Sequence, residues 1–296
     1  METDDSFESA VHRHDALIAE LGQPIWVGSE PTFTDREAQT PAWLHAALGD
    51  DKELRAQALL GTLGRLMPGA LVLRSVGRLY PGEKLPRWNL GLLRRRDGEP
   101  LWNGPPDPIL APEPVPAAPP HIAAFASALS EAFASQHWAS ECAETAKGED
   151  TDKEDADDAP DWTVTATTEA DAEPLQFVLR AFEDPAEPDA DRTPCPAIEL
   201  PEIARVDRFL AALPCIERAA QACGLQALVW TGATPPVDAS LELTTVTPDP
   251  AVIEINSAPS RNCAEFLWRS QQIYAAAAAH GLSPYRLYFN GQVADS

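Results

Sequence analysis

Glu254 and Asn256 are the two residues whose type and spacing most clearly indicate chemistry. They lie in the segment PDPAVIEINSAPS (248–260), whose apolar residues predict a buried strand. Because side chains alternate along a strand, Ile253 and Ile255 should point to one face, and Glu254 and Asn256 to the other. The latter two are then roughly 6 to 7 Å apart along the strand. A carboxylate and an amide oxygen suit a magnesium ion that also binds nucleotide phosphates. The same pair also fits the solvent face of an edge strand.

A second group of candidates is basic. Arg74, Arg78, Lys84 and Arg87 place four cations within fourteen residues of an otherwise acidic protein. Arginine offers a bidentate fork to phosphate or carboxylate, and lysine offers a point charge. We therefore predict that Arg78 and Arg87 act in catalysis, and that Arg74 and Lys84 contact the nucleotide together with Asn256. Alternatively, these basic side chains are simply solvated, or one of them pairs with Glu83, and no ligand is bound.

The elements that must position these residues alternate between helix and strand. Helical spacing and cap signals predict helices over residues 8–21, 50–67, 122–137, 202–223 and 262–279, the last capped by Asn262. Strands are predicted over 24–33, 70–77, 162–168, 175–182, 225–232, 240–247 and the segment described first. This order predicts an α+β fold, with a mixed or antiparallel sheet and helices packed on it.

Composition divides the chain into five regions. Residues 1–102 and 162–296 carry the predicted elements and should form the two parts of one sheet domain. Between them, residues 103–120 are proline-rich and predict an extended spacer, 121–140 a helical segment, and 141–161 an acidic linker too poor in apolar residues to fold. Near the end of the chain, Asn290-Gly291 is a strong hairpin signal with few residues left for the returning strand. The last part of the domain is therefore expected to be truncated.

Overall composition excludes several classes of partner. The chain has 22 Lys and Arg against 46 Asp and Glu, a formal charge of -24, which argues against nucleic acid and anionic membranes. No apolar run is long enough to span a bilayer and the first residues are acidic, so we expect a cytoplasmic protein. Five scattered cysteines without CxxC spacing predict neither a disulfide framework nor a zinc site, and no cysteine nucleophile is evident.

Three motifs in combination carry a family resemblance. These are the GxEPTF turn at 28–33, the YPGExLPRW loop at 80–88 and the RRDGxPLW segment at 95–102. Together with the later block LELTTVTPDPAVIEINSAPS (241–260), they resemble the bacterial putative amidoligase family, whose members are often associated with transglutaminase-like domains. The chain departs from the family pattern between the blocks, where its proline-rich and acidic segments stand, and at its end.

The resemblance implies a glutamine-synthetase-like carboxylate-amine ligase that uses ATP and Mg²⁺ to join a carboxylate and an amine through an acyl phosphate. Carried over by motif, Glu30, Glu254 and Asn256 are the metal ligands. The implied substrates are small molecules or peptides, and a transglutaminase-like or other amidoligase-pathway protein is an expected partner. An ATP-grasp-like ligase is one alternative, since that fold also ends a strand in an acidic-x-Asn pair. An inactive remnant that serves as a protein-binding module is the other.

Overall fold

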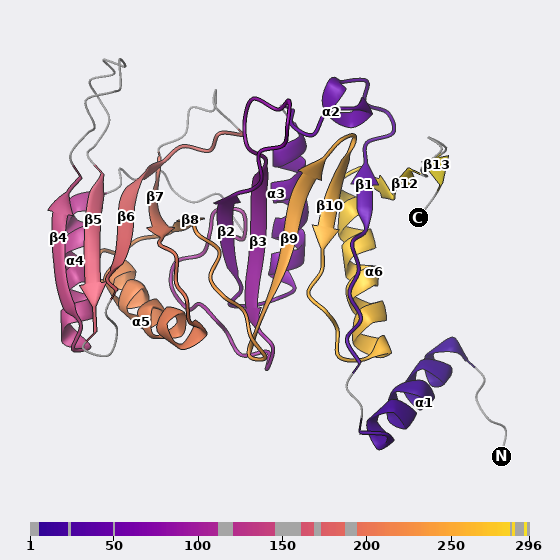
Figure 1. Ribbon diagram of the computed structural model, residues 1–296, viewed down its shortest axis with the longest axis horizontal. Coiled ribbons are helices and arrows are strands. Elements are labelled where there is room, and N and C mark those ends of the chain that lie inside the picture. The colour runs from indigo at the N-terminus through magenta and orange to yellow at the C-terminus, as the bar shows by residue number, and fades with distance from the viewer. Residues whose placement is uncertain are drawn as a thin grey trace. The chain divides into compact units, whose positions relative to one another are not determined.

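The computed structural model of the 296-residue chain contains two compact units. It describes residues 6–22, 25–49, 51–111, 121–145, 161–168, 173–186, 194–284, 286–287 and 293–294. Unit 1 is formed by Met1–Leu63 together with Leu243–Ser296, and unit 2 by Gly64–Glu242. Both units combine strands with packed helices, which confirms the predicted α+β class (Figure 1).

The helices of unit 1 are α1 (Phe7–Glu20), α2 (Pro41–Leu44), most of α3 (Lys52–Arg65) and α6 (Cys263–Ala279). Three of these four helices lie within two residues of their predicted bounds, and the short helix α2 was not predicted. The side chain of Asn262 accepts the N–H of Glu265 at 2.8 Å, so the predicted cap of α6 is confirmed. Gly281 follows α6 with φ +69°, a left-handed conformation that a glycine adopts without a steric penalty.

The sheet of unit 1 is antiparallel, in the order β11-β1-β10-β9. These strands are β11 (Ser283–Pro284), β1 (Thr32–Thr34), β10 (Val252–Asn256) and β9 (Leu241–Asp249), of which only residues 241 and 242 belong to unit 2. Phe33, Ile253 and Ile255 are fully buried on one face, and the ring of Phe33 meets that of Tyr274 on α6 edge to face at 5.3 Å. The predicted alternation of β10 is therefore confirmed.

The first predicted strand is shorter than expected. The sequence predicted a strand over 24–33, but the regular ladder of β1 begins only at Thr32. Pro31 has no N–H to donate, which interrupts the hydrogen-bond pattern. An isolated antiparallel bridge between Val27 and Ser260 nevertheless shows that the chain runs alongside the continuation of β10.

Asp35 fixes the turn that follows β1. Its carboxylate accepts the N–H groups of Glu37 and Ala38 at 2.9 and 3.1 Å and pairs with Arg55 of α3 at 2.6 Å. Burial acts to raise the pKa of Asp35, but these N–H groups and the guanidinium outweigh it, so the pKa lies below its usual 3.8.

Asp35→Asn is expected to reduce the free energy of unfolding at pH 7 by about 1–2 kcal/mol, because it removes the charge that Arg55 faces. A carboxylate with a lowered folded-state pKa stabilises fully above its unfolded value, and this contribution is lost as the pH falls through the folded value. The difference between wild type and variant should therefore narrow below pH 3.8. Urea denaturation at pH 7, 5 and 3 measures the difference in the free energy of unfolding between the two proteins. An equal difference at all three pH values would contradict this account.

Unit 2 has a mixed sheet in the order β3-β2-β8-β7-β6-β5-β4. Its strands are β2 (Leu71–Val76), β3 (Trp88–Arg95), β4 (Ala139–Glu144), β5 (Trp162–Thr167), β6 (Leu175–Phe182), β7 (Cys195–Leu200) and β8 (Val229–Gly232). Strand β8 is parallel to both neighbours, β2 and β7, and the other pairs are antiparallel. The sheet is thus mixed, which is one of the two arrangements that the sequence predicted.

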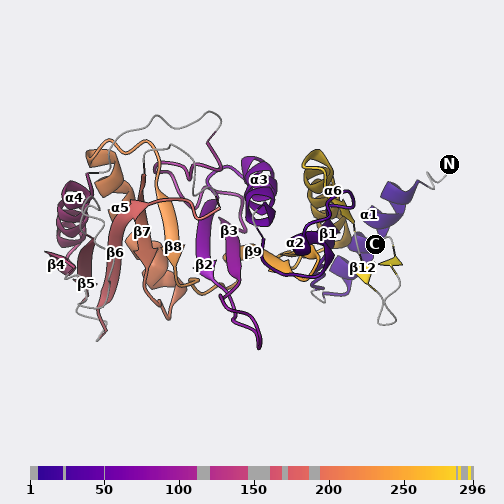
Figure 2. The ribbon, with the colours of Figure 1, turned by 90° about the horizontal axis from the view of Figure 1, so that it is seen from above.

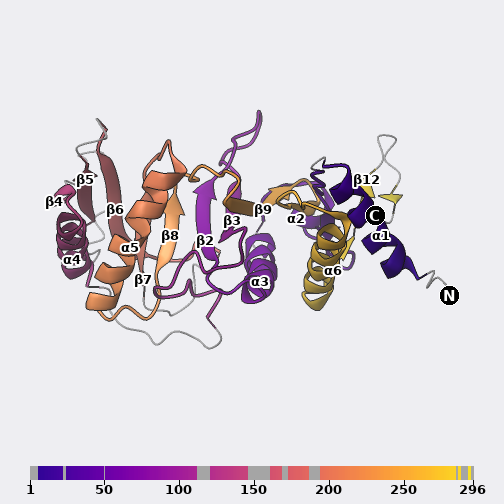
Figure 3. The ribbon, with the colours of Figure 1, turned by 90° about the horizontal axis from the view of Figure 1, so that it is seen from below.

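Helices α4 (Ile122–Ser135) and α5 (Val206–Ala222) lie on the same side of the unit 2 strands (Figures 2 and 3). Phe125 and Phe133 of α4 and Phe209 of α5 are fully buried. The ring of Phe133 stacks on that of Phe177 of β6 at 5.4 Å. This ring contact joins α4 to the sheet, and the buried side chains of both helices belong to the core of unit 2.

Three strands of unit 2 fall where no strand was predicted. Strand β3 follows the YPGExLPRW loop, and β7 lies between the strand predicted at 175–182 and the helix predicted at 202–223. Strand β4 takes in residues 141–144 of the predicted acidic linker. The described part of the predicted spacer, 103–111, is packed rather than extended, since Asp107 is 3% exposed and Pro106 accepts the N–H of Leu228. Residues 112–120 and 146–160 lie outside the described residues.

The last described residues form a separate two-stranded ladder. Strands β12 (Arg286–Leu287) and β13 (Val293–Ala294) pair antiparallel on either side of the predicted hairpin signal, which itself lies outside the described residues. Among the described helices, none combines the length and apolar character needed to cross a lipid bilayer.

Candidate functional site

The backbone beside β10 places Glu30 opposite Asn256. Thr32 pairs with Glu254 in the β1–β10 ladder, and the same register continues toward the start of the chain. The N–H of Ile255 donates to the carbonyl of Pro31 at 3.0 Å, and that of Ser257 donates to the carbonyl of Ser29 at 3.0 Å. Glu30 lies between these two bonded pairs and therefore faces Asn256, in the type of pair whose side chains approach most closely.

The side of the sheet onto which Glu30 points follows from its neighbours. The hydroxyl groups of Ser29 and Ser257 meet at 3.0 Å, on the face to which Ile253 and Ile255 also belong. By alternation, Glu30 points to the other face, with Glu254 and Asn256. The carboxylates of Glu30 and Glu254 and the amide of Asn256 thus share one face of the unit 1 sheet, although Glu30 and Asn256 are 226 positions apart along the chain.

The environment of these three side chains suits a cation with oxygen ligands. Glu30 is exposed, and Glu254 and Asn256 are half-buried. The amide nitrogen of Asn256 donates to one carboxylate oxygen of Glu254 at 2.9 Å, which orients the amide oxygen and leaves the second carboxylate oxygen outside this bond. In the register, Thr247 and Thr245 of β9 face Glu254 and Asn256. The donor set of two carboxylates, one amide oxygen and neighbouring hydroxyl groups matches the preference of Mg²⁺.

The basic loop between β2 and β3 is a closed hairpin tip. The N–H of Gly77 donates to the carbonyl of Arg87 at 2.7 Å, and the N–H of Arg87 donates back to the carbonyl of Arg78 at 3.1 Å. A Cβ atom on Gly77 would lie 2.7 Å from that carbonyl oxygen, so this close approach requires glycine. The two predicted catalytic arginines are consequently neighbours at the base of the loop.

Tyr80 and Glu83 organise the arginines of this loop. The guanidinium of Arg87 lies over the ring of Tyr80 at 4.0 Å, and that of Arg78 lies over the same ring at 5.8 Å. Arg87 also pairs with Glu83 at 2.9 Å, which lowers the pKa of the Glu83 carboxyl. Lys84 is exposed at the tip. The ion pair with Glu83, which the sequence analysis gave as an explanation without a ligand, is therefore formed by Arg87.

Arg74 is held in a buried ion pair. Its guanidinium makes a two-pronged contact with the carboxylate of Asp107, one arm of which measures 3.0 Å, and it lies over the ring of Phe182 at 5.4 Å. The side chains are 10% and 1% exposed. The guanidinium of Arg74, which the sequence analysis predicted to contact a nucleotide, thus binds the Asp107 carboxylate of the same unit.

Burial disfavours the thiolate form of three of the cysteines. All five cysteines are free. Burial is the main cause that raises the pKa of Cys195 to about 11, and burial also raises the pKa of Cys215 and of Cys223. The absence of disulfides agrees with the sequence analysis.

Comparison with known proteins identifies the family. The model of the family described as "Putative amidoligase enzyme (DUF2126)" matches residues 5–186 and 190–296. The chain belongs to this amidoligase family. Searches of curated proteins and of solved structures found no match. The family match covers both units and supports a ligase-type function.

In this member of the family, the predicted site residues form two groups. Glu30, Glu254 and Asn256 belong to unit 1 and share a sheet face there. Arg74, Arg78, Lys84 and Arg87 belong to unit 2, where Arg78 and Arg87 gather around Tyr80 and Arg74 is paired separately.

A further basic cluster of the chain was not singled out from the sequence. Arg94 and Arg96 both pair with the carboxylate of Glu242, whose side chain is 3% exposed. Arg96 contacts the second oxygen of Glu242 at 3.1 Å and also donates to the carbonyl of Leu241 at 3.2 Å. The run of three arginines at 94–96 could have indicated this cluster. Their partner Glu242, however, lies 146 positions away from Arg96 in the sequence.

Proposed function

We propose that this protein is an ATP- and Mg²⁺-dependent carboxylate-amine ligase. In such a reaction, a substrate carboxylate oxygen attacks the terminal phosphorus of ATP and ADP departs. The amine nitrogen then attacks the acyl carbon and releases phosphate, so an amide replaces the two starting groups. Membership of the amidoligase family supports the ligase class. The observation that carries the proposal further is the register that sets Glu30 against Asn256 and beside Glu254.

The residues of unit 1 would hold the cation. Glu30, Glu254 and the amide oxygen of Asn256 supply two negative charges and three oxygen donors from one face of the sheet. The Asn256–Glu254 hydrogen bond fixes both side chains in advance, which reduces the ordering cost of binding. When bound there, Mg²⁺ would offset the negative charge of the nucleotide phosphates.

The loop between β2 and β3 of unit 2 carries the basic side chains that we propose to bind anionic groups. Arg78 and Arg87 are positioned by the ring of Tyr80, and Lys84 stands exposed at the tip. We assign to them the binding of an anionic group, a phosphate or a carboxylate, on unit 2 itself. Arg74, by contrast, is best explained as a structural partner of Asp107, because ligand binding would require that buried pair to separate.

Calorimetry with ATP tests the proposal. The wild-type protein is expected to bind ATP in the presence of Mg²⁺ and to lose this binding when EDTA replaces the metal. Glu254→Ala should abolish the magnesium-dependent binding, because it removes a charged ligand. Glu37→Ala is the matched control, since it removes an exposed carboxylate of the same unit that lies outside the proposed cluster.

One outcome would contradict the proposed ligase function, and another would contradict the proposed metal site. If the wild type binds no ATP at millimolar concentrations with Mg²⁺, the protein-binding module becomes the better account of the fold. If Glu254→Ala and wild type bind equally, the nucleotide site lies elsewhere. Circular dichroism of each variant establishes that a lost signal does not come from lost folding.

A further inference from the structure

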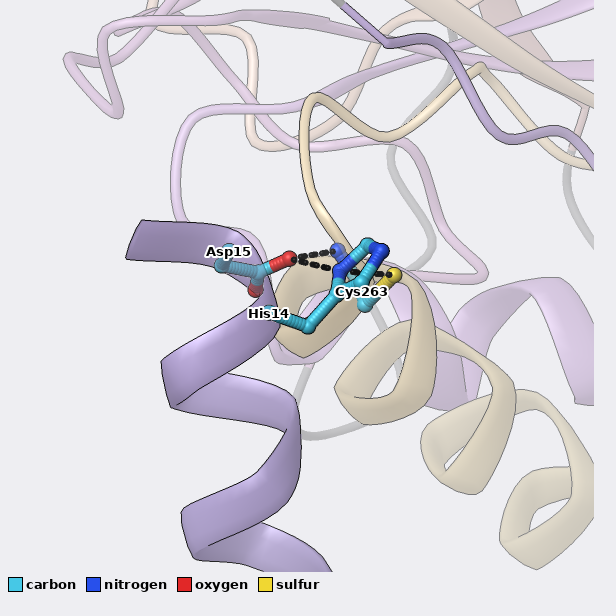
Figure 4. A group of neighbouring side chains, drawn as sticks. All are labelled: His14, Asp15 and Cys263. Atoms are coloured by element: carbon cyan, nitrogen blue, oxygen red, sulfur yellow. Dashed lines mark hydrogen bonds and ion pairs between the residues drawn. The ribbon is translucent and has the colours of Figure 1, made fainter. Parts of the chain in front are cut away.

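Three side chains of different chemistry converge where α1 meets the start of α6. His14 and Asp15 belong to α1, and Cys263 is the first residue of α6 (Figure 4). One ligand atom of each lies within 4.8 Å of the others. The imidazole Nδ1 of His14 is 3.6 Å from the Sγ of Cys263 and 3.4 Å from an oxygen of Asp15. All three residues belong to unit 1 and lie apart in sequence from the predicted magnesium ligands.

These separations match the edges of a tetrahedral metal site. Zinc binds sulfur at about 2.3 Å, nitrogen at about 2.0–2.1 Å and carboxylate oxygen at about 2.0–2.2 Å. With tetrahedral angles, these bond lengths give edges of about 3.5 Å between nitrogen and sulfur and about 3.4 Å between nitrogen and oxygen. The observed 3.6 and 3.4 Å match these two edges, and the third separation, between sulfur and oxygen, is within 4.8 Å.

The carboxylate of Asp15 is already fixed by the backbone of α6. One oxygen accepts the N–H of Cys263 at 3.0 Å, and the other accepts the N–H of Ala264 at 2.9 Å. A carboxylate offers about four lone-pair directions, so these bonds do not exhaust its capacity. Backbone donors that orient a ligating carboxylate are typical outer partners of protein metal sites.

The same residues do not form the relay of a cysteine nucleophile. In such a relay the base contacts the thiol through one ring nitrogen and is oriented through the other. Here, Asp15 and Cys263 both approach Nδ1 of His14. A shared central ion instead requires the three ligand atoms to lie close to one another, as they do here.

We propose that His14, Asp15 and Cys263 bind a divalent transition metal of the zinc class, with water or an added ligand at the fourth position. Three protein ligands with an open fourth position are an established zinc arrangement, and a mixed nitrogen, sulfur and oxygen set selects zinc over magnesium. The thiolate and the carboxylate together neutralise the charge of the ion beside the positive end of α6. This site is independent of the proposed ligase chemistry.

The site would also fasten α1. No residue of this 14-residue helix is buried, and Phe7, Leu17 and Leu21 at or next to it are 60% exposed or more. The helix therefore gains little from apolar packing, and a metal bridge to α6 would strengthen the attachment that the two hydrogen bonds of Asp15 already make. Metal binding is expected to slow hydrogen exchange in α1 and leave the unit 2 core unchanged.

Cobalt and zinc titrations of the full chain test the proposal. Co²⁺ added to metal-free protein should produce the thiolate-to-cobalt charge-transfer absorption, which Zn²⁺ then removes by displacement. Cys263→Ser should abolish this absorption. Both Cys263→Ser and His14→Ala should weaken Zn²⁺ binding by at least about 10- to 100-fold, which is the loss that even an outer partner causes.

The controls keep the residue types and change the positions. His12→Ala removes another exposed imidazole of α1, and Cys223→Ser removes another half-buried thiol, so both should bind Co²⁺ as the wild type does. The proposal is overturned if the wild type shows no charge-transfer band, or if Cys263→Ser and His14→Ala retain wild-type affinity. Serine is nearly isosteric with cysteine, and circular dichroism verifies that α6 still forms.

Discussion

Glu254→Gln is expected to reduce magnesium-dependent amide formation by at least about 100-fold. The variant keeps the shape of the side chain and an oxygen that can accept the Asn256 amide hydrogen, so the local hydrogen bond can persist. It removes one of the two negative charges proposed to hold the cation, and with it the balance of charge around the transferring phosphoryl group. Loss of a single preorganised electrostatic partner typically lowers turnover by about 10²–10³-fold.

Hydroxylamine provides the measurement, because it can replace an unknown amine and trap an activated carboxylate as a hydroxamate. A panel of amino-acid carboxylates with ATP and Mg²⁺ supplies the other substrate. Glu30→Gln should act in the same direction as Glu254→Gln, since both carboxylates lie on one sheet face, whereas Glu37→Gln should leave the rate unchanged. Hydroxamate formation at the wild-type rate in Glu254→Gln would refute the role assigned to this residue.

Asp107→Ala is expected to lower the free energy of unfolding by about 3–5 kcal/mol. The variant would leave the guanidinium of Arg74 buried without its carboxylate, and an uncompensated buried charge is among the most destabilising changes a protein can undergo. The N–H of Ile109, which donates to Asp107 at 3.0 Å, would lose its acceptor as well. Urea denaturation followed by the fluorescence of the buried tryptophans measures the change.

The double variant Arg74→Met, Asp107→Leu separates charge from packing. Apolar residues that replace both partners of a buried pair are often tolerated, so most of the stability should return. Asp107→Asn should cost less than Asp107→Ala, because an oxygen remains for Ile109. A loss below about 1 kcal/mol in Asp107→Ala would mean that water reaches Arg74 and that the pair is not essential to unit 2.

Local patterns were sufficient to predict much of the fold. The apolar spacing of α3, the Asn262 cap of α6 and the alternation around Glu254 depend on residues close in sequence, and each is confirmed. The face shared by Glu254 and Asn256 follows from strand geometry alone. Glu30 was assigned to the metal site only by the family resemblance, and its place opposite Asn256 was not predicted.

Long-range pairing explains what the sequence could not predict. Strand β7 begins with Cys195-Pro196 in a proline-rich region, and only its place between β6 and β8 makes it a strand. The buried state of Arg74 depends on Asp107 in a segment whose composition indicated a spacer. His14 and Cys263 are 249 positions apart, and neither has a local companion that signals a metal site.

Unit 1 is assembled from both ends of the described chain, with unit 2 inserted between them. During synthesis on the ribosome, all of unit 2 emerges before β9 and β10 exist to complete the sheet around β1. The first sixty or so residues must therefore wait for the last fifty, and Phe33 stays without its permanent neighbours during that time. A chaperone that protects this early segment would assist the yield of folded protein more than one that acts on the finished chain.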